Sequence, residues 1–255
     1  MDDIIVKIIE KPKLNNTTVI EGLPGIGLVG KLAADHLIDE LKAKKFAELY
    51  SVFLPPQVLI QDDGTIKLVN HEFYYVKRGD KDLIILTGDF QGITPESQYK
   101  LSEFSLDFIQ QFNVDTIYTL GGLGTGDITH SPKVFGAATS KEIIEKLREH
   151  GVIFKGGGGI FGASGLLLGL GQLRGIKCAC LMGETHGQII DAKSAEAVLE
   201  VLTKIIGIEI SMAKLEEKAK ETEREINEIG KMIAAQKEAF EREQKIPDDI
   251  PSYIR

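Results

Sequence analysis

Short apolar stretches alternate with longer amphipathic ones along residues 1–207. Several short stretches are apolar at every position, as in 83–86, which is typical of a strand buried on both faces. The predicted strands are 17–21, 46–53, 57–60, 65–69, 72–77, 82–87, 116–120, 152–154 and 176–182. Helices are predicted over 27–41, 162–173 and 192–206, with two more described below. This alternation predicts an α/β three-layer sandwich with a mixed, largely parallel sheet, into which 46–77 inserts antiparallel ribbons.

Two further helices are predicted from their first residues. Thr94 is a good N-cap, Pro95 suits the first helical position, and Glu96 adds an acidic side chain to the first turn. Ser131 and Pro132 repeat this arrangement, so a helix is also expected to begin there.

The pattern changes at Ile208, after which apolar residues recur every seven positions with a companion row three residues later. The predicted seam comprises Met212, Leu215, Ala219, Ile226, Ile229, Ile233 and Phe240. Residues 208–245 are therefore expected to form a long amphipathic or coiled-coil helix, about 55 Å long if 209–245 is one helix. Such a helix either lies on its own domain or packs against another chain, and the narrow stripe favours the second.

The last ten residues, 246–255, are expected to form an extended tail, since Pro247 and Pro251 end the helix. Ile250, Tyr253 and Ile254 are apolar, and Arg255 carries the terminal carboxylate. A tail of this kind either frays or docks into a partner's pocket, and both remain open.

The composition narrows the class of protein. The chain has 255 residues and a formal net charge of −8, which argues against nucleic acid as a partner. It has no signal-peptide pattern and no apolar run long enough for a bilayer, so a cytoplasmic protein without membrane contact is predicted. Cys178 and Cys180 suit a reduced, buried setting. Of the 27 glycines, four lie in 22–30, four in 121–126 and nine in 156–175, where the backbone turns or approaches another group.

The glycine-rich segment after the first predicted buried strand matches two phosphate-binding patterns incompletely. Gly25, Gly27 and Gly30 have the spacing of a dinucleotide fingerprint. Gly25 to Lys31 also matches a phosphate loop, but Leu32 stands where that loop needs Ser or Thr for magnesium. Close packing of the first helix is the favoured interpretation, and a ligand site formed by 22–31 and 121–126 is the alternative.

Polar side chains near predicted strand ends do not complete a catalytic set. They are Asp89, Asp127, His130, Glu184, His186 and Asp191, and they lack metal-ligand spacing. Ser164 fails the nucleophile motif because residue 166 is Leu. No catalytic residue, metal or cofactor is therefore predicted, and the alternative is a small-molecule or nucleotide-binding enzyme that uses the glycine loops.

Six short sequence motifs, taken together and in order, are more specific for a protein family than any one of them alone. In chain order they are Gly22-Leu-Pro-Gly-Ile-Gly-Leu-Val-Gly30, Leu54-Pro-Pro-Gln57, Thr87-Gly-Asp-Phe-Gln91, Tyr118-Thr-Leu-Gly-Gly122, Leu166-Leu-Leu-Gly169 and Leu181-Met-Gly-Glu-Thr-His-Gly187. Over about residues 1–210 the chain resembles the archaeal homologues of the proteasome assembly chaperone family.

The resemblance implies an α/β sandwich without catalytic residues. It also implies homo-oligomers whose C-terminal segments reach partner proteins, such as proteasome α-subunits or a related assembly chaperone. Family members that engage the α-ring often have Tyr second from last, whereas here Tyr253 is third from last.

Overall fold

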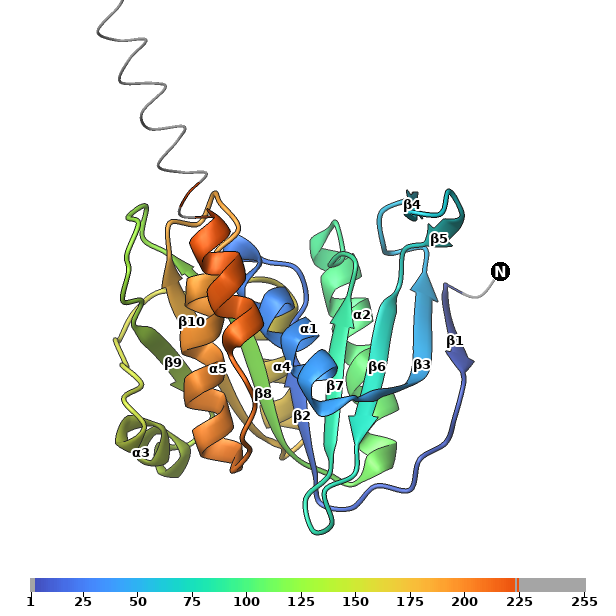
Figure 1. The fold of residues 1–255 in the computed structure, drawn as a ribbon. Helices are drawn as coiled ribbons and strands as arrows, with labels where there is room; N and C mark the ends of the chain where they lie inside the picture. The colour runs from blue at the N-terminus through green and yellow to red at the C-terminus, as the bar shows by residue number, and fades with distance from the viewer. Residues whose placement is uncertain (1–2, 223, 225–255) are drawn as a thin grey trace, which may run out of the picture.

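The computed structural model describes residues 3–222 and 224, and within them an eight-stranded sheet runs in the order β1-β3-β6-β7-β2-β8-β10-β9 (Figure 1). Its strands are β1 (Ile4–Ile8), β2 (Thr17–Glu21), β3 (Lys44–Ser51), β6 (His71–Val76), β7 (Leu83–Gly88), β8 (Val114–Gly124), β9 (Val134–Ala138) and β10 (Lys177–Thr185). β4 (Val58–Ile60) and β5 (Ile66–Leu68) form a separate hairpin.

The helices are α1 (Val29–Leu41), α2 (Pro95–Ile109), α3 (Lys141–Glu149), α4 (Gly162–Leu173) and α5 (Ala192–Ile206), with 3-10 turns η1 (Ile26–Leu28) and η2 (Gln110–Phe112). Residues 213–222 are also helical. In the described part of the chain, no helix is long and apolar enough to cross a membrane.

The parallel pairs of strands in the sheet join β7 to β2, β2 to β8 and β8 to β10. β6, β3 and β1 continue the sheet on one side by antiparallel pairing, and β9 pairs antiparallel with β10 on the other. The α/β sandwich and its mixed sheet are confirmed, but the sheet is less parallel than the sequence predicted. No helix lies between β3, β6 and β7 along the chain, which favours antiparallel pairing. β9 also pairs antiparallel with β10, although α3 and α4 lie between them in the chain.

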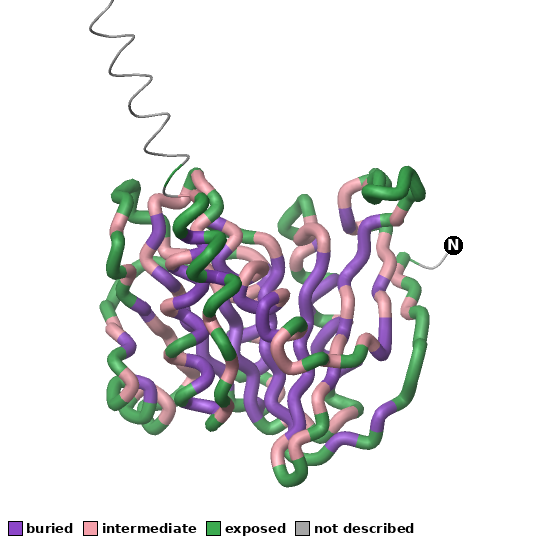
Figure 2. The backbone as a smooth tube through the Cα atoms, in the orientation of Figure 1, coloured by how far each residue is buried: buried purple, intermediate pink, exposed green. Residues whose placement is uncertain are grey.

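Helices cover the two faces of the sheet with separate apolar clusters. α1, α5 and the start of the C-terminal helix pack on one face, with Leu37 and Leu199 fully buried. α2 and α4 pack on the other, with Leu106 and Leu167 buried among the strand side chains. Figure 2 shows that buried residues are concentrated in the central strands.

The two helix starts predicted from local sequence have different outcomes. α2 begins as predicted: the Thr94 hydroxyl accepts from the Ser97 backbone N–H, and Ser97 bonds back to Thr94. The helix predicted after Ser131 is wrong, because the chain there leads into β9, whose apolar residues pair with β10. The next helix, α3, begins after Ser140, whose hydroxyl accepts from the Ile143 N–H at 3.3 Å.

β1 and β9 were not predicted, and the strand predicted at 152–154 is not a full strand. Ile153 forms a single parallel bridge to Phe135 of β9. The segment 152–154 therefore lies alongside the sheet as a short edge cover.

Candidate functional site

The glycine-rich segment 22–30 connects β2 to α1 at the carboxyl end of the parallel strands. A Cβ at Gly30 would overlap the carbonyl oxygen of Leu120, and one at Gly22 would overlap that of Gly30. Gly27 has φ +63°, and a Cβ there would lie 2.8 Å from Thr185 Oγ1. Gly25 has ordinary space around it. Gly22 and Gly30 thus allow α1 to lie directly against β8, which supports the packing interpretation.

The second glycine loop packs against the first. Gly121–Gly124 are not loop but the last residues of β8, paired with Met182–Thr185 of β10. A Cβ at Gly122 would overlap the carbonyl oxygen of Ile26. Of the candidate ligand loop 121–126, therefore, only the residues after Gly124 lie outside the sheet.

Lys31, the cation of the candidate ligand loop, is engaged within α1. Its Nζ lies 2.6 Å from Asp35 Oδ1, and Thr87 Oγ1 lies 3.4 Å from the same oxygen. The structure thus directs the charge of Lys31 toward a carboxylate one helical turn away.

Glu21, which the sequence analysis missed, is the buried ionisable group of this region. Its carboxylate accepts from the Leu23 N–H at 3.0 Å and from Ser164 Oγ at 2.9 Å. Burial raises the pKa of Glu21 to about 7, although both hydrogen bonds act in the opposite direction. Because Ser164 lies in the first turn of α4, this contact ties the end of β2 to the helix layer. A glutamate at the end of an otherwise uncharged strand, Thr-Thr-Val-Ile-Glu, was the available signal.

Gln91 fastens the glycine segment to the same helix. Its Nε2 donates to the Pro24 carbonyl at 2.8 Å, and its Oε1 accepts from the Ala163 N–H at 3.0 Å. The side chain thus joins the loop after β2 to the start of α4, so the hydrogen bonds of this region hold the loop and the helix together.

The polar residues at the strand ends have separate structural partners. Asp89 accepts from the Asn70 N–H and pairs with Lys67, at 3.1 Å each. Asp191 caps α5 by accepting from the Ser194 N–H at 2.9 Å. Glu184 accepts from the Lys133 N–H at 3.3 Å. Asp127 and His130 lie on the exposed loop after β8. Within residues 3–222 and 224, no three His, Cys, Asp or Glu side chains gather as a metal site.

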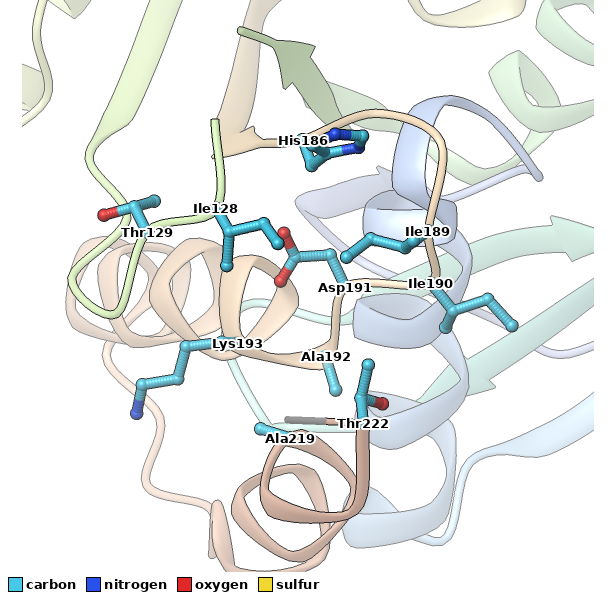
Figure 3. Close-up of a pocket in the computed structure, with 10 residues that line it drawn as sticks. All are labelled: Ile128, Thr129, His186, Ile189, Ile190, Asp191, Ala192, Lys193, Ala219 and Thr222. Carbon is cyan, nitrogen blue, oxygen red and sulfur yellow. The ribbon is translucent and has the colours of Figure 1, made fainter. Parts of the chain in front are cut away.

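A small cavity lies where the loops after β8 and β10 meet the start of the C-terminal helix (Figure 3). Its walls include Ile128, Ile190, Ala219 and Thr222, with His186 at one end. The cavity holds about 30 Å³, which is room for a single water molecule. This space is too small for a nucleotide.

The start of the C-terminal helix is fastened to the α/β body. Leu215 and Ala219 are 1% and 6% exposed and belong to the cluster under α1 and α5. His36 Nε2 lies 2.7 Å from the Ser211 carbonyl, and Arg78 Nη2 donates to the Gly207 carbonyl at 2.7 Å. This part of the seam therefore contacts its own domain.

Of the other seam residues, Met212 packs against the edge of the same cluster. The remaining predicted contact residues lie outside the described part of the chain: Ile226, Ile229, Ile233, Phe240, Ile250, Tyr253, Ile254 and Arg255.

A line of alternating charges crosses the face of β1, β3 and β6. Glu48 lies 3.0 Å from Lys7 and 3.3 Å from Lys45, and Glu72 lies 2.7 Å from Lys45 and 3.0 Å from Lys67. Burial acts to raise the pKa of Glu72, but hydrogen bonds from its neighbours outweigh it and lower the pKa to about 2. These carboxylates are held ionised by lysines, so they are poorly suited to proton transfer near neutral pH.

With this geometry in place, comparison with known proteins gives a clear result. A model of the PAC2 family matches residues 19–229. The chain belongs to the PAC2 family.

Relatives match almost the whole PAC2 chain. A Methanocaldococcus jannaschii protein described as uncharacterized protein MJ1210 is 44% identical over 96% of this chain and 95% of its own length. The crystal structure of Pyrococcus furiosus PbaB, described as an archaeal proteasome activator, is 45% identical with a TM-score of 0.85, over 90% of this chain and all of that chain. Pyrococcus furiosus PbaA, described as an archaeal homolog of proteasome-assembly chaperone, is 29% identical with a TM-score of 0.75, over 93% and 97% of the two chains.

The PAC2 match includes both glycine segments and the anchored start of the C-terminal helix, and it ends before the tail. The resemblance inferred from the ordered motifs is thus confirmed at the level of the family.

Proposed function

We propose that this PAC2 protein is a homo-oligomeric scaffold of the proteasome-assembly-chaperone type, without enzymatic activity, that binds partner protein subunits through its C-terminal helix and tail. The observation that carries the proposal is the 45% identity to the proteasome activator PbaB over the full length of that chain. The expected partners are further copies of itself and proteasome α-subunits or a related assembly chaperone.

The geometry supports a scaffold better than a ligand-binding enzyme. The two glycine segments pack against each other, because the space beside Gly30 and Gly122 is filled by the carbonyl groups of Leu120 and Ile26. Lys31 is paired with Asp35. Leu215 and Ala219 fasten the beginning of the C-terminal helix to a large apolar cluster. A helix whose first turns are already fixed on the body loses less conformational entropy on binding a partner than a helix whose first turns are free.

Tail binding is tested with the full chain and proteasome α-subunits in a pulldown and by native mass measurement. Tyr253→Ala is expected to weaken binding about tenfold or more, because aromatic anchors carry much of an interface's energy. Ser252→Ala is the matched control, and it should bind like the unaltered chain. Equal binding by both variants, and by a chain lacking 246–255, would remove the tail from the proposal.

The helix seam is tested by the mass of the assembly alone. Ile226→Asp places a charge on the predicted seam, whereas Asn227→Asp places the same charge one position away. The first should reduce the assembly mass at fixed concentration and the second should not. A monomeric unaltered chain would contradict the homo-oligomeric scaffold as a whole. A nucleotide panel that raised Tm, with the rise lost in Lys31→Gln, would instead favour the ligand-binding alternative.

A further inference from the structure

The two edge strands of the eight-stranded sheet differ in whether their outer backbone groups have hydrogen-bond partners. At the β9 edge, the segment 152–154 supplies backbone partners: the Gly136 N–H donates to the Ile153 carbonyl and the Ile153 N–H to the Val134 carbonyl, at 2.9 Å each. At the other edge, β1 pairs with β3 alone and is the outermost ribbon on the right of Figure 1. Among the described residues, the outer side of β1 has no strand partner.

The outward-facing backbone groups of β1 follow from its pairing with β3. The Ile9 N–H donates to Phe46, and the Val52 N–H donates to the Asp3 carbonyl. In an antiparallel ladder, alternate residues bond to the same neighbour, so residues 3, 5, 7 and 9 face β3. The N–H and C=O groups of the even-numbered residues, Ile4, Val6 and Ile8, therefore point away from the sheet.

The usual protections of an exposed edge are missing from β1. Proteins guard such edges with proline, bulges or outward charges. β1 contains no proline, and its one charged residue, Lys7, pairs with Glu48 of its own sheet at 3.0 Å. Ile5 and Ile8 are 45% and 42% exposed. Just after β1, the Ile9 and Glu10 N–H groups both donate to the Phe46 carbonyl, so the ladder is irregular there. Over Ile4–Ile8 the edge is thus apolar, and its outward backbone groups are available to a further strand.

We propose that β1 pairs antiparallel with β1 of a second copy, about a two-fold axis at Val6, so that two sheets join into one. The inference rests on the homo-oligomer of the proposed function and names its contact surface. A two-fold axis perpendicular to β1 relates two copies of this edge as antiparallel strands, so the same outward groups serve on both sides of the contact and a second copy is the natural occupant.

Only the axis at Val6 uses every outward group of the described strand. Val6 then pairs with its own copy, and Ile4 pairs with Ile8 of the partner subunit, so that all their N–H and C=O groups are satisfied. An axis at Lys7 would place two lysines opposite each other, and an axis at Ile5 would leave Ile8 unpaired within the described strand. The chain's own tail is a poorer occupant because Pro247 and Pro251 interrupt its row of N–H donors.

A cysteine trap tests the register. In a hydrogen-bonded pair the Cα atoms lie about 5.5 Å apart, within the range of a disulfide. Val6→Cys should therefore give a covalent dimer on mild oxidation. In the matched control Ile5→Cys, the two cysteines are offset by two positions, and cross-linking should fall at least tenfold because diagonal neighbours lie about 7–8 Å apart. The native Cys178 and Cys180 are buried and should not contribute. Equal cross-linking of the two variants, or none in either, would overturn the register.

Val6→Pro tests the contact without a cross-link. Proline removes only the outward N–H of Val6 and leaves the bonds to β3 in place. The association constant, from assembly mass across concentrations, is expected to fall about tenfold or more, since strand addition depends on backbone bonds. Ile66→Thr on the exposed hairpin is the control, and circular dichroism checks the fold. If the unaltered chain assembles and folded Val6→Pro assembles equally well, this inference fails and the proposed function stands. If the unaltered chain is monomeric, the proposed function itself fails.

Discussion

Helices cover both faces of the sheet at β7, β2, β8 and β10, the covered half. At β6, β3 and β1, the uncovered half, the face that carries α1 and α5 has no described helix (Figure 1). The covered strands β2 and β7 are buried at every position. β6 instead alternates buried and half-buried residues. The same sheet therefore meets two environments, and side-chain periodicity follows the number of covered faces.

The two halves also use different interactions. The covered half depends on contacts so close that Gly22 and Gly30 have no room for a side chain. The uncovered half keeps its aromatic packing on the α2 side, where Phe73 lies 4.8 Å from Phe108 between ring centroids, and carries the lysine–carboxylate line on the other. A close-packed layer tolerates little change, whereas a solvated ionic surface tolerates much more.

The largest expected effect is on the covered half, from Gly30→Val. The new side chain would overlap the Leu120 carbonyl, so α1 must move off β8, at an expected loss of about 3 kcal/mol or more in the free energy of unfolding. Urea unfolding at fixed protein concentration measures the loss. Gly169→Ala in α4 is the control: nothing lies within 4 Å of its Cβ position, so a gain of up to about 1 kcal/mol is expected. A stable Gly30→Val would mean that α1 is not held by this contact.

Leu215→Ala comes next, since it opens space in the cluster beneath α1 and α5. Removing a fully buried leucine side chain costs about 2–3 kcal/mol, and Leu215 is 1% exposed. The substitution should also make the chain after Gly207 more sensitive to limited proteolysis. Lys218→Ala, at an exposed position of the same helix, should change stability by less than about 0.5 kcal/mol. Similar unfolding free energies for the two variants would show that packing of this helix does not stabilise the covered half.

The sequence predicted the covered half better than the uncovered one. β2, α4 and α5 were predicted with their observed bounds, because there the local pattern and the burial agree. In the uncovered half, β1 was not predicted. At the opposite edge of the sheet, β9 was missed because Val-Phe-Gly-Ala-Ala is short and holds a glycine. Ser131 and Pro132 have the local chemistry of a helix start, but pairing with β10 decides the structure there.

Tertiary contacts also decided the parts of the candidate site that the sequence could not give. Glu21 looks like an ordinary polar strand end until α4 covers it with Ser164. Likewise, the heptad pattern does not distinguish a seam for another chain from a face on the chain's own body. Leu215 and Ala219 are buried because the 208–212 segment directs the helix back onto α1 and α5.

The pH dependence of stability probes two buried groups near the carboxyl ends of the parallel strands. Burial raises the pKa of Glu21 from 4.5 to about 7, so its contribution is full below pH 4.5 and is lost as the pH rises toward 7. Burial lowers the pKa of His71 from 6.5 to about 4, so its contribution is full above pH 6.5 and is lost as the pH falls toward 4. Between pH 4.5 and 6.5 the two slopes oppose each other.

Glu21→Gln should therefore reveal the slope of His71, with stability rising by about 2 kcal/mol from pH 4.5 to 6.5. His71→Gln should show the reverse slope. Urea unfolding at several pH values measures both against the flatter profile of the unaltered chain. Superimposable profiles for the three proteins would contradict the buried-carboxyl account.

The smallest expected effect is in the uncovered half, from Lys45→Met. Lys45 lies between Glu48 and Glu72, but Lys7 and Lys67 still neutralise these carboxylates after the change. The loss should stay below about 1 kcal/mol and shrink in high salt, because the network is open to solvent on one side. Lys44→Met, on the same strand and without an ion pair among the described residues, controls for the lost charge. A loss of unfolding free energy as large as that of Leu215→Ala would mean that another group covers this face and excludes water from it. Both halves of the sheet would then be covered on both faces, by different groups.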